Sequence, residues 1–318
     1  MPPSMNYAEI QAPVAPHLRE AERILSAALE THHPLMQNLL HHTPARSGKK
    51  VRSTLLFLLA ECQGTVTPSL DALGAAIEMF HLSSLIHDDI CDNSHQRRGE
   101  RTLHSHAGNL LSVLWGDYCF ITSLKLFNDQ GHHNLVEPLI RTAQEMIAGQ
   151  ILEFDHTNDY ELDERTYCTI IGQKTAALFS GIAEIAALLA GEPAETVAEY
   201  AAFGTDFGMV FQIRDDLLDI FSTESGKDRF RDLQEGKITL PTIRLVREYS
   251  AEQIRQLVET RDSAAIIALI ERSGVLAEVS RVMDEYTGKA RAFLGRFADS
   301  PARQSLYGLL DFVSQRDF

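Results

Sequence analysis

The sequence is poor in cysteine and in basic residues. Its four cysteines, at positions 62, 91, 119 and 168 of 318, show no CxxC spacing, so we expect neither a disulfide framework nor a thiolate metal site. The 29 Lys and Arg residues are outnumbered by 44 Asp and Glu residues, which gives a net charge of -15. This acidic balance argues against a nucleic-acid-binding surface, because such a surface needs a basic patch.

A targeting segment and a transmembrane run are lacking as well. The apolar stretch 176–191 spans only 16 residues and contains Glu184, which makes it too short and too polar to cross a membrane. The N-terminal segment has neither the basic start nor the apolar core of a signal peptide. We therefore expect no membrane span and a cytoplasmic location.

Sustained two-residue alternation, the pattern typical of β-strands, is absent from the sequence. Apolar residues instead recur at three- and four-residue intervals, which predicts helices over 51–62, 110–127, 135–154, 164–190 and 194–221. We therefore predict an all-α fold, a large single-domain helical bundle. Four prolines among residues 1–16 predict an irregular N-terminal arm, and the helical domain is expected over 17–318.

Three aspartates, Asp88, Asp89 and Asp92, form a DDxxD motif at the end of an apolar stretch. Residues four apart lie on one face of a helix, so Asp88 and Asp92 are expected to point the same way. Carboxylates are hard oxygen ligands that suit Mg²⁺, which usually binds one or two of them together with substrate phosphates. Arg97 and Arg98 follow the motif, and guanidinium groups bind phosphate oxygens bidentately.

A second DDxxD motif consists of Asp215, Asp216 and Asp219, begins 127 residues after the first and also ends an apolar stretch. A single run of aspartates at a helix end is ordinarily a solvated surface. Two such runs are hard to assign to chance, and to act together they must face a common cavity. Facing helices of a bundle can build a metal site of this kind at their centre.

With these motifs in this order, the chain resembles the trans-prenyl diphosphate synthases, which elongate isoprenoid chains head to tail. The resemblance covers roughly residues 49–241. It implies the isoprenoid synthase fold around a central cavity, a homodimer, and Mg²⁺ as cofactor, about three ions per active site. The implied substrates are isopentenyl diphosphate and an allylic diphosphate such as farnesyl or geranyl diphosphate. The implied metal ligands are Asp88, Asp92, Asp215 and Asp219.

The resemblance also assigns a binding site for the diphosphate of isopentenyl diphosphate. Lys49 and Arg52 lie in a basic cluster before a predicted helix, and helix N-termini favour anions. A similar stretch of the family binds this diphosphate. Ser47 and Ser53 stand where the family pattern has a glycine and a proline, a departure that changes the stiffness of the loop and not its charge. His81 and Arg98 match further contacts to isopentenyl diphosphate, whereas Arg97 matches a contact to the allylic diphosphate.

The remaining matches concern the reacting end of the allylic substrate. Lys174 and Thr175 match a pair that holds the departing diphosphate, and Gln212 offers an amide oxygen to a carbocation. Lys227 and Lys237 match lysines of a flexible loop that covers the diphosphate. The implied catalytic set is Asp88, Asp89, Asp92, Lys174, Thr175, Gln212, Asp215, Asp216 and Lys237.

Two other functions need different motifs. A class I terpene cyclase shares the first aspartate motif but carries Ser or Thr where Asp219 stands, and Glu where Thr223 stands. A non-catalytic helical partner of a heteromeric synthase should have degraded aspartate motifs, and both motifs are intact here. The sequence therefore favours the elongating enzyme over either alternative.

In the family that the chain resembles, product length depends on the helix that precedes the first aspartate motif, which corresponds here to the helix before Asp88. Bulky aromatic residues at the fourth or fifth position before this aspartate stop growth early, and here those positions are Ser84 and Ser83, both small. Phe80 lies about 12 Å from Asp88, because a helix rises about 1.5 Å per residue, and it could close the tunnel there. We therefore expect a product longer than C20.

The strongly apolar segment 110–127 carries two further expectations. It has few polar positions to face water, which supports the homodimer that the resemblance implies. Its Trp115 or Tyr118 could form the floor of the product tunnel in place of Phe80. Against a long product, the stretch GQILEF at 149–154 looks partly like shorter-chain members, so a C15 or C20 product is the alternative.

Overall fold

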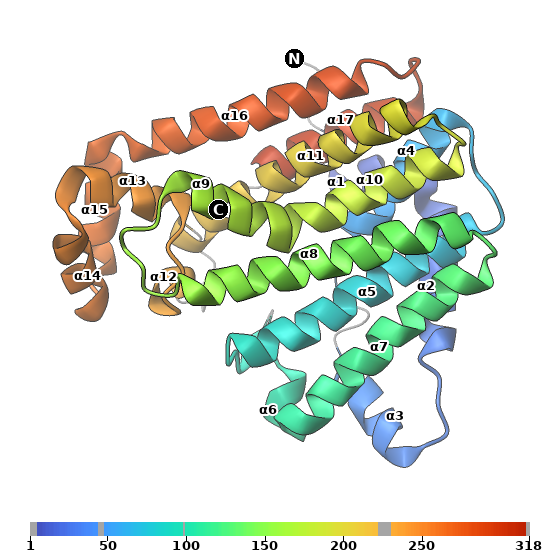
Figure 1. Cartoon of the computed structure of the whole chain (residues 1–318), viewed down its shortest axis with the longest axis horizontal. Helices are drawn as coiled ribbons and strands as arrows, with labels where there is room; N and C mark the ends of the chain where they lie inside the picture. Colours follow the sequence, from blue (N-terminus) through green and yellow to red (C-terminus); the bar gives the residue numbers. More distant parts are fainter. Residues whose placement is uncertain (1–4, 44–47, 98, 222–229, 316–318) are drawn as a thin grey trace.

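The computed structural model describes residues 5–43, 48–97, 99–221 and 230–315, and Figure 1 shows them as a bundle of helices. The predicted all-α fold is confirmed. In chain order the elements are α1 (Tyr7–Gln11), η1 (Ala12–Val14), α2 (Ala15–Ala28), α3 (Pro34–His41), α4 (Val51–Gln63), α5 (Leu70–Cys91), β1 (Gln96–Arg97), β2 (Glu100–Arg101), α6 (Leu103–Ala107), α7 (Asn109–Asp129), η2 (His133–Leu135), α8 (Val136–Asp155), α9 (Glu164–Ile171), η3 (Gly172–Ala176), α10 (Ala177–Leu189), α11 (Ala194–Phe221), α12 (Arg231–Gln234), α13 (Leu240–Tyr249), α14 (Ala251–Glu259), α15 (Ser263–Ser273), α16 (Val275–Leu294) and α17 (Pro301–Gln315).

The two aspartate motifs sit at the ends of the two longest helices, α5 and α11. Both helices bury residues around most of their circumference, as expected of helices in the core of a bundle. Helix α5 packs against α2, α4 and α7, whereas α11 packs against α10, α16 and α17. The bundle therefore brings two segments that are distant in sequence into its interior.

The expected irregular arm over residues 1–16 is wrong for the part of it that the structure describes, which is helical from Tyr7 onward. A capping box begins α1: the side chain of Asn6 accepts the N–H of Glu9 at 3.0 Å, and the Glu9 carboxylate accepts the N–H of Asn6 at 2.8 Å. Pro13 and Pro16 stand in the first turns of η1 and α2. A missing N–H is tolerated there, so these prolines do not break the helices.

The helix expected over 164–190 is interrupted by a five-residue π-turn, η3, which joins α9 to α10. Helix α8 packs closely against this turn at Gly149, where a Cβ atom would lie 2.6 Å from the backbone nitrogen of Lys174. Only a glycine permits this approach. Single π-turns inside helices occur frequently at functional sites, and this one carries Lys174 and Thr175.

One face of α7 and α8 exposes large apolar side chains, with Leu110, Leu114, Ile121, Ile147 and Ile151 each more than half exposed. By length and composition, α7 is the one described helix that could cross a membrane. A single helix of this kind is weak evidence for a span, because helices of soluble proteins pass the same test. What the structure establishes is an apolar face that the described part of the chain leaves exposed.

Candidate active site

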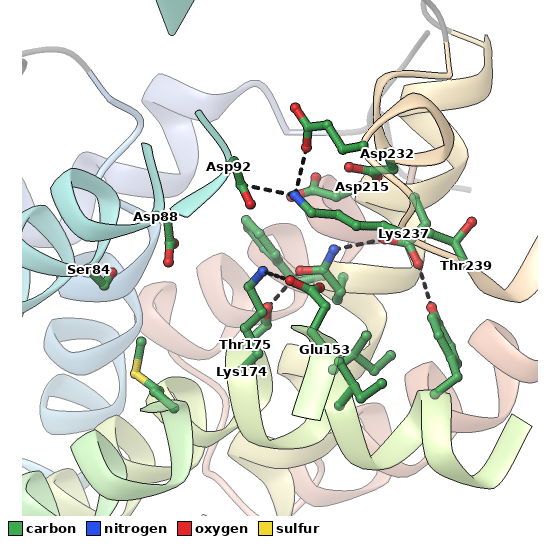
Figure 2. Close-up of a pocket in the computed structure, with 18 of the residues that line it drawn as sticks. Ser84, Asp88, Asp92, Glu153, Lys174, Thr175, Asp215, Asp232, Lys237 and Thr239 are labelled. Carbon is green, nitrogen blue, oxygen red and sulfur yellow. Dashed lines mark hydrogen bonds and ion pairs between the residues drawn. The ribbon is translucent and has the colours of Figure 1, made fainter. Parts of the chain in front are cut away.

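Both aspartate motifs line one cavity of about 380 Å³. Asp88 and Asp92 enter it from α5, and Asp215 and Asp216 enter it from α11. Figure 2 shows Asp88 and Asp92 on one side of the cavity, with Asp215 on the other side. The expectation that the two motifs face each other across a common space therefore agrees with the geometry.

The cavity is lined by more acidic side chains than lysine and arginine side chains. Among the described residues, seven carboxylates line it: Asp88, Asp92, Glu153, Asp215, Asp216, Asp232 and Glu235. Five lysine and arginine side chains line it as well: Arg52, Arg97, Lys174, Arg231 and Lys237. Burial raises the pKa of Asp88, and repulsion from Asp92 raises it further, against the opposing effects of Lys174 and Arg97. Such a site favours the entry of additional cations.

The middle aspartate of the first motif, Asp89, is buried and does not line the cavity. Its carboxylate accepts the Nε–H of Arg97 at 2.7 Å. Arg97 does line the cavity, so Asp89 holds an arginine in place and does not itself face the substrate space. Burial raises the pKa of Asp89, and Arg97 opposes that rise.

The middle aspartate of the second motif, Asp216, belongs to a chain of hydrogen bonds. It accepts from the hydroxyl of Tyr167 at 2.5 Å and from Nε2 of Gln212 at 2.8 Å. The Oε1 atom of Gln212 in turn accepts from the hydroxyl of Thr175 at 2.7 Å. This chain orients the Gln212 amide and connects α9, η3 and α11 at the wall of the cavity.

Asp219, an expected metal ligand, does not line the cavity. Its carboxylate accepts the backbone N–H groups of Arg231 at 3.1 Å and Asp232 at 3.2 Å, at the start of α12. Burial, followed by repulsion from Asp232, raises the pKa of Asp219 to about 7. Its role as a metal ligand stays a prediction, and Asp232 is the carboxylate that reaches the cavity in its place (Figure 2).

Two lysines of the expected catalytic set are paired with carboxylates. The ammonium of Lys237 lies 2.9 Å from Asp92 and 2.8 Å from Glu235, and Lys174 forms an ion pair with Glu153. Burial by itself would lower the pKa of Lys237, but the surrounding carboxylates, chiefly Asp92 and Asp232, raise it above its ordinary value.

Sequence reasoning missed three of these carboxylates: Glu153, Asp232 and Glu235. Glu153 lies in the stretch GQILEF, which we interpreted only for product length. It stands three residues after Gln150, on the same face of α8. Its carboxylate accepts from Nε2 of Gln150 at 3.1 Å. Asp232 and Glu235 lie in the same charged segment as Lys237. The concentration of charged residues there could have indicated a functional site, but we assigned a role only to the lysines.

The sequence profile of the Polyprenyl synthetase family matches residues 33–271. The chain belongs to this family. It is 29% identical to the octaprenyl diphosphate synthase of Escherichia coli over 98% of this chain and all of the relative. It is 32% identical to the geranyl-diphosphate-specific all-trans-nonaprenyl-diphosphate synthase of Rhodobacter capsulatus, over 97% of each chain.

Solved structures agree with this membership. A polyprenyl synthase from Caulobacter crescentus, solved with calcium and isoprenyl diphosphate, superposes with a TM-score of 0.91 at 29% identity. The match covers 99% of both chains. The resemblance inferred from the aspartate motifs is therefore confirmed, as is the isoprenoid synthase type of fold.

The acidic set suits Mg²⁺ in chemistry but is not a closed metal cage. Within residues 5–43, 48–97, 99–221 and 230–315, no three acidic, histidine or cysteine side chains converge tightly enough to hold an ion. The carboxylates instead approach the cavity from two sides, Asp88 and Asp92 from one and Asp215 and Asp232 from the other (Figure 2). Mg²⁺ commonly takes one or two carboxylates and completes its shell with substrate phosphates and water, so these residues fit it.

Not all of the residues expected to bind isopentenyl diphosphate line the cavity. Arg52 and His81 line the cavity, and so does Arg97, the expected contact to the allylic diphosphate. Lys49 does not line it, and its ammonium lies 4.7 Å from the centre of the Phe312 ring. Arg98, the remaining expected contact to isopentenyl diphosphate, lies outside the described residues, and so does Lys227 of the expected loop over the allylic diphosphate.

Of the residues expected to set product length, Ser84 lines the cavity and Ser83 does not. The Ser83 hydroxyl is turned toward α7, where it donates to the carbonyl of Gly116 at 2.9 Å. Phe80 is buried, and the centre of its ring lies 5.7 Å from that of Phe120 on α7.

The two aromatic residues proposed as an alternative floor lie away from the cavity. Trp115 is buried and donates its Nε1–H to the hydroxyl of Thr43 at 2.8 Å. Tyr118 is partly exposed and stacks on Trp115 at 5.3 Å. Neither residue contacts the cavity as it stands. Met146 on α8 does line it, and it was not among the expected length-determining residues.

Proposed function

We propose that the protein is a trans-prenyltransferase that condenses isopentenyl diphosphate head to tail onto an allylic diphosphate such as farnesyl or geranyl diphosphate. One observation carries the proposal: the two aspartate motifs face each other across a single cavity that also contains Lys174, Lys237 and Arg97. Such an arrangement can bind a diphosphate between opposing walls and stabilise it when it leaves as an anion.

The reaction begins when the allylic carbon–oxygen bond breaks, which gives a delocalised carbocation and a pyrophosphate anion. Arg97, Lys174 and Lys237 place positive charge around the departing pyrophosphate. Groups fixed in advance where charge develops commonly give the largest catalytic contribution. Mg²⁺, when bound by the aspartates, supplies further neutralisation of the pyrophosphate charge; the proposed number of about three ions stays a prediction.

The new carbon–carbon bond forms when the double bond of isopentenyl diphosphate attacks the carbocation. One proton must then leave, and we assign it to the departed pyrophosphate, because no described side chain stands out as a dedicated base. The Oε1 atom of Gln212, oriented by Thr175, offers a negative dipole to the cation. Leu178 and Phe211 line the same cavity and exclude water that would quench the cation.

A product longer than C20 is the length that the octaprenyl and nonaprenyl names of the relatives support. The cavity wall at Ser84 is consistent with this, because a serine leaves room where an aromatic ring would end growth. The cavity of about 380 Å³ must also accommodate the diphosphate groups of the substrates. A product longer than C20 therefore needs further space along α5. A C15 or C20 product is the alternative.

The active unit is proposed to be a homodimer in which the apolar face of α7 and α8 is covered by a second copy. Soluble monomers rarely expose large contiguous apolar patches, and several isoleucine and leucine side chains of this face are more than half exposed. The cytoplasmic location expected from the sequence stays a prediction.

The proposal is tested with the purified single chain, Mg²⁺, isopentenyl diphosphate and either farnesyl or geranyl diphosphate. The expected result is an elongated allylic diphosphate whose length is read by chromatography. Cyclic hydrocarbon formed from the allylic substrate alone would indicate a terpene cyclase. Absence of activity until a second protein is added would indicate a helical subunit of a heteromeric synthase.

A further inference from the structure

The N-terminal helix α1 is fastened to the basic cluster that precedes α4. The hydroxyl of Tyr7 donates to the backbone carbonyl of Lys49 at 2.5 Å, and Nε2 of Gln11 donates to the same carbonyl at 3.0 Å. The two donors therefore converge on one carbonyl oxygen about 40 residues further along the chain. Two side chains on one backbone acceptor hold it more firmly than a single bond.

A fixed carbonyl also fixes the group on the other side of the peptide. The peptide is planar and trans, so the N–H of Lys50 points away from the carbonyl of Lys49. When Tyr7 and Gln11 hold that carbonyl toward α1, the N–H of Lys50 is held toward the opposite side. Helix α1 thereby sets the direction of a backbone donor at the entrance to α4.

The conformation of Lys50 adds to this relationship. Its φ angle is 53°, in the left-handed region that residues with a side chain rarely adopt. Its carbonyl accepts from the Thr54 hydroxyl at 2.7 Å and from the Thr54 N–H at 3.0 Å. Gln11 donates to the same Thr54 hydroxyl at 3.0 Å. A strained backbone conformation of this kind persists only where the surrounding structure enforces it. Gln11 contributes to this, because it donates to the Lys49 carbonyl before Lys50 and to the Thr54 hydroxyl after it.

The Lys49 side chain is held from a second direction. Its ammonium lies 4.7 Å from the centre of the Phe312 ring on α17, and that ring lies 4.5 Å from the ring of Tyr7. Tyr7 therefore supports both the carbonyl of Lys49 and the ring beneath its ammonium. Three residues after Lys49, Arg52 reaches the cavity from the first turn of α4.

We propose that Tyr7 and Gln11 are positioning residues for the diphosphate of isopentenyl diphosphate. They act through the Lys49–Lys50 peptide and do not touch the substrate. Helix N-termini bind anions through backbone N–H groups, so the orientation of this peptide affects the affinity for the anion. The inference rests on the proposed function, and it assigns a role in substrate binding to a helix outside the cavity.

The test compares Tyr7→Phe, Gln11→Leu and the double variant with the wild-type enzyme. Tyr7→Phe keeps the ring on Phe312 and removes only the donor, whereas Gln11→Leu removes both Gln11 bonds. Each single change removes one of the two bonds to the Lys49 carbonyl, and it is expected to raise the KM for isopentenyl diphosphate about fivefold, the effect of losing one ordinary hydrogen bond. The KM for the allylic diphosphate and kcat should stay within about twofold of the wild type, because the aspartates and Lys174 are untouched.

Tyr249→Phe, at the end of α13, is the matched control for loss of a tyrosine hydroxyl, and it should leave both KM values unchanged. Binding of isopentenyl diphosphate without an allylic partner, measured by calorimetry, should weaken by the same factor as KM rises. If the double variant does not fold, the comparison of Tyr7→Phe with Tyr249→Phe decides the matter. Equal rises in both KM values, or a lower Tm with unchanged KM values, would show that α1 only stabilises the fold.

The outcomes separate this inference from the proposed function. A wild-type enzyme that forms no product from isopentenyl diphosphate refutes the proposed function, and the inference with it. An active wild type in which Arg52→Ala raises the KM for isopentenyl diphosphate, while Tyr7→Phe and Gln11→Leu do not, overturns the inference alone.

Discussion

The Lys237 ammonium lies 2.9 Å from the Oδ2 atom of Asp92, so the segment after α12 provides a cation directly to the first aspartate motif (Figure 2). Glu235 shares the same ammonium at 2.8 Å. A divalent cation at this position would be attracted more strongly by the same carboxylate oxygens than the single positive charge of the ammonium is. We therefore expect Lys237 to release Asp92 when a metal ion and a diphosphate bind.

Replacing Lys237 by Gln is expected to raise the affinity for a divalent cation and to lower turnover. Without substrate, Asp92 no longer has its ammonium partner, so the variant should bind Mn²⁺, used as a probe for Mg²⁺, more tightly than the wild type. Titration followed by electron paramagnetic resonance measures this affinity. Turnover should fall by about 10²-fold, as when one fixed charge-stabilising group is removed from an active site.

The matched control for this experiment is Lys289→Gln, which removes a lysine charge from the exposed face of α16. It should change neither the affinity for Mn²⁺ nor turnover. Weaker Mn²⁺ binding by Lys237→Gln would contradict the competition between lysine and metal, and normal turnover would remove Lys237 from the catalytic set.

Asp88→Asn is expected to lower the activity and to raise the stability of the folded chain. Burial and the neighbouring Asp92 raise the pKa of Asp88, so the folded chain holds this proton to a higher pH than the unfolded chain does. Folding then takes up a proton, and stability falls as pH rises above about 4, the ordinary pKa of aspartate. At neutral pH without metal, the neutral asparagine should raise Tm by roughly 2 °C or more, while turnover falls about 10²-fold.

Thermal unfolding between pH 4 and pH 7 checks the sign of this effect. The advantage of Asp88→Asn in Tm should grow across that range and vanish at its acidic end. Asp284→Asn, on the exposed side of α16, is the control and should show no pH-dependent advantage. A variant that is less stable than the wild type at neutral pH without metal would show that the Asp88 carboxylate supports the fold.

Much of this architecture could be predicted because it depends on local patterns. The spacing of apolar residues predicted the helix over 194–221 with the bounds that α11 has, and the repeated DDxxD pattern predicted that α5 and α11 share a cavity. The π-turn at Gly172–Ala176 was not predictable from periodicity, because one extra residue per turn hardly changes an apolar helical pattern. The helical N-terminus was missed because prolines in first turns and prolines in loops look alike in sequence.

The features that the sequence did not reveal concern contacts between distant segments. Asp219 follows the spacing of a metal ligand, yet its carboxylate binds the backbone at the start of α12. That contact brings Asp232 to the cavity, and no spacing rule connects the two residues. Glu153 reaches Lys174 because Gly149 allows α8 to approach the π-turn. Such relationships depend on tertiary packing, which a single sequence does not reveal.

The oligomeric state is expected to depend on the apolar face of α7 and α8. Ile121→Glu and Ile147→Glu each place a charge on a side chain that is about 60% exposed in the single chain. A buried charge without a partner strongly opposes association, so each variant should be a monomer of 35.5 kDa by light scattering where the wild type is a dimer. Val66→Glu, at an exposed apolar residue outside this face, is the matched control and should stay dimeric. A wild-type mass of one chain at micromolar concentration would refute the dimer.

The length of the product is expected to respond to Ser84, the residue of α5 that lines the cavity one turn before Asp88. In Ser84→Phe, a benzyl group replaces a hydroxymethyl group and blocks the path along α5. The product should shorten to C15 or C20, while the rate of the first condensation stays within a few fold of the wild type. Chromatography of the dephosphorylated products measures both quantities.

Ser83→Ala is the matched control, because the Ser83 hydroxyl is turned toward α7 and bonded to Gly116, so its loss should leave product length unchanged. Phe80→Ala tests the floor: removing the ring that packs on Phe120 should lengthen the product if growth stops there. If Phe80→Ala has no effect and Met146→Phe shortens the product, the chain grows toward α8 instead. A wild-type product of C15 or C20, or an unchanged product from Ser84→Phe, would contradict growth along α5 beyond Ser84.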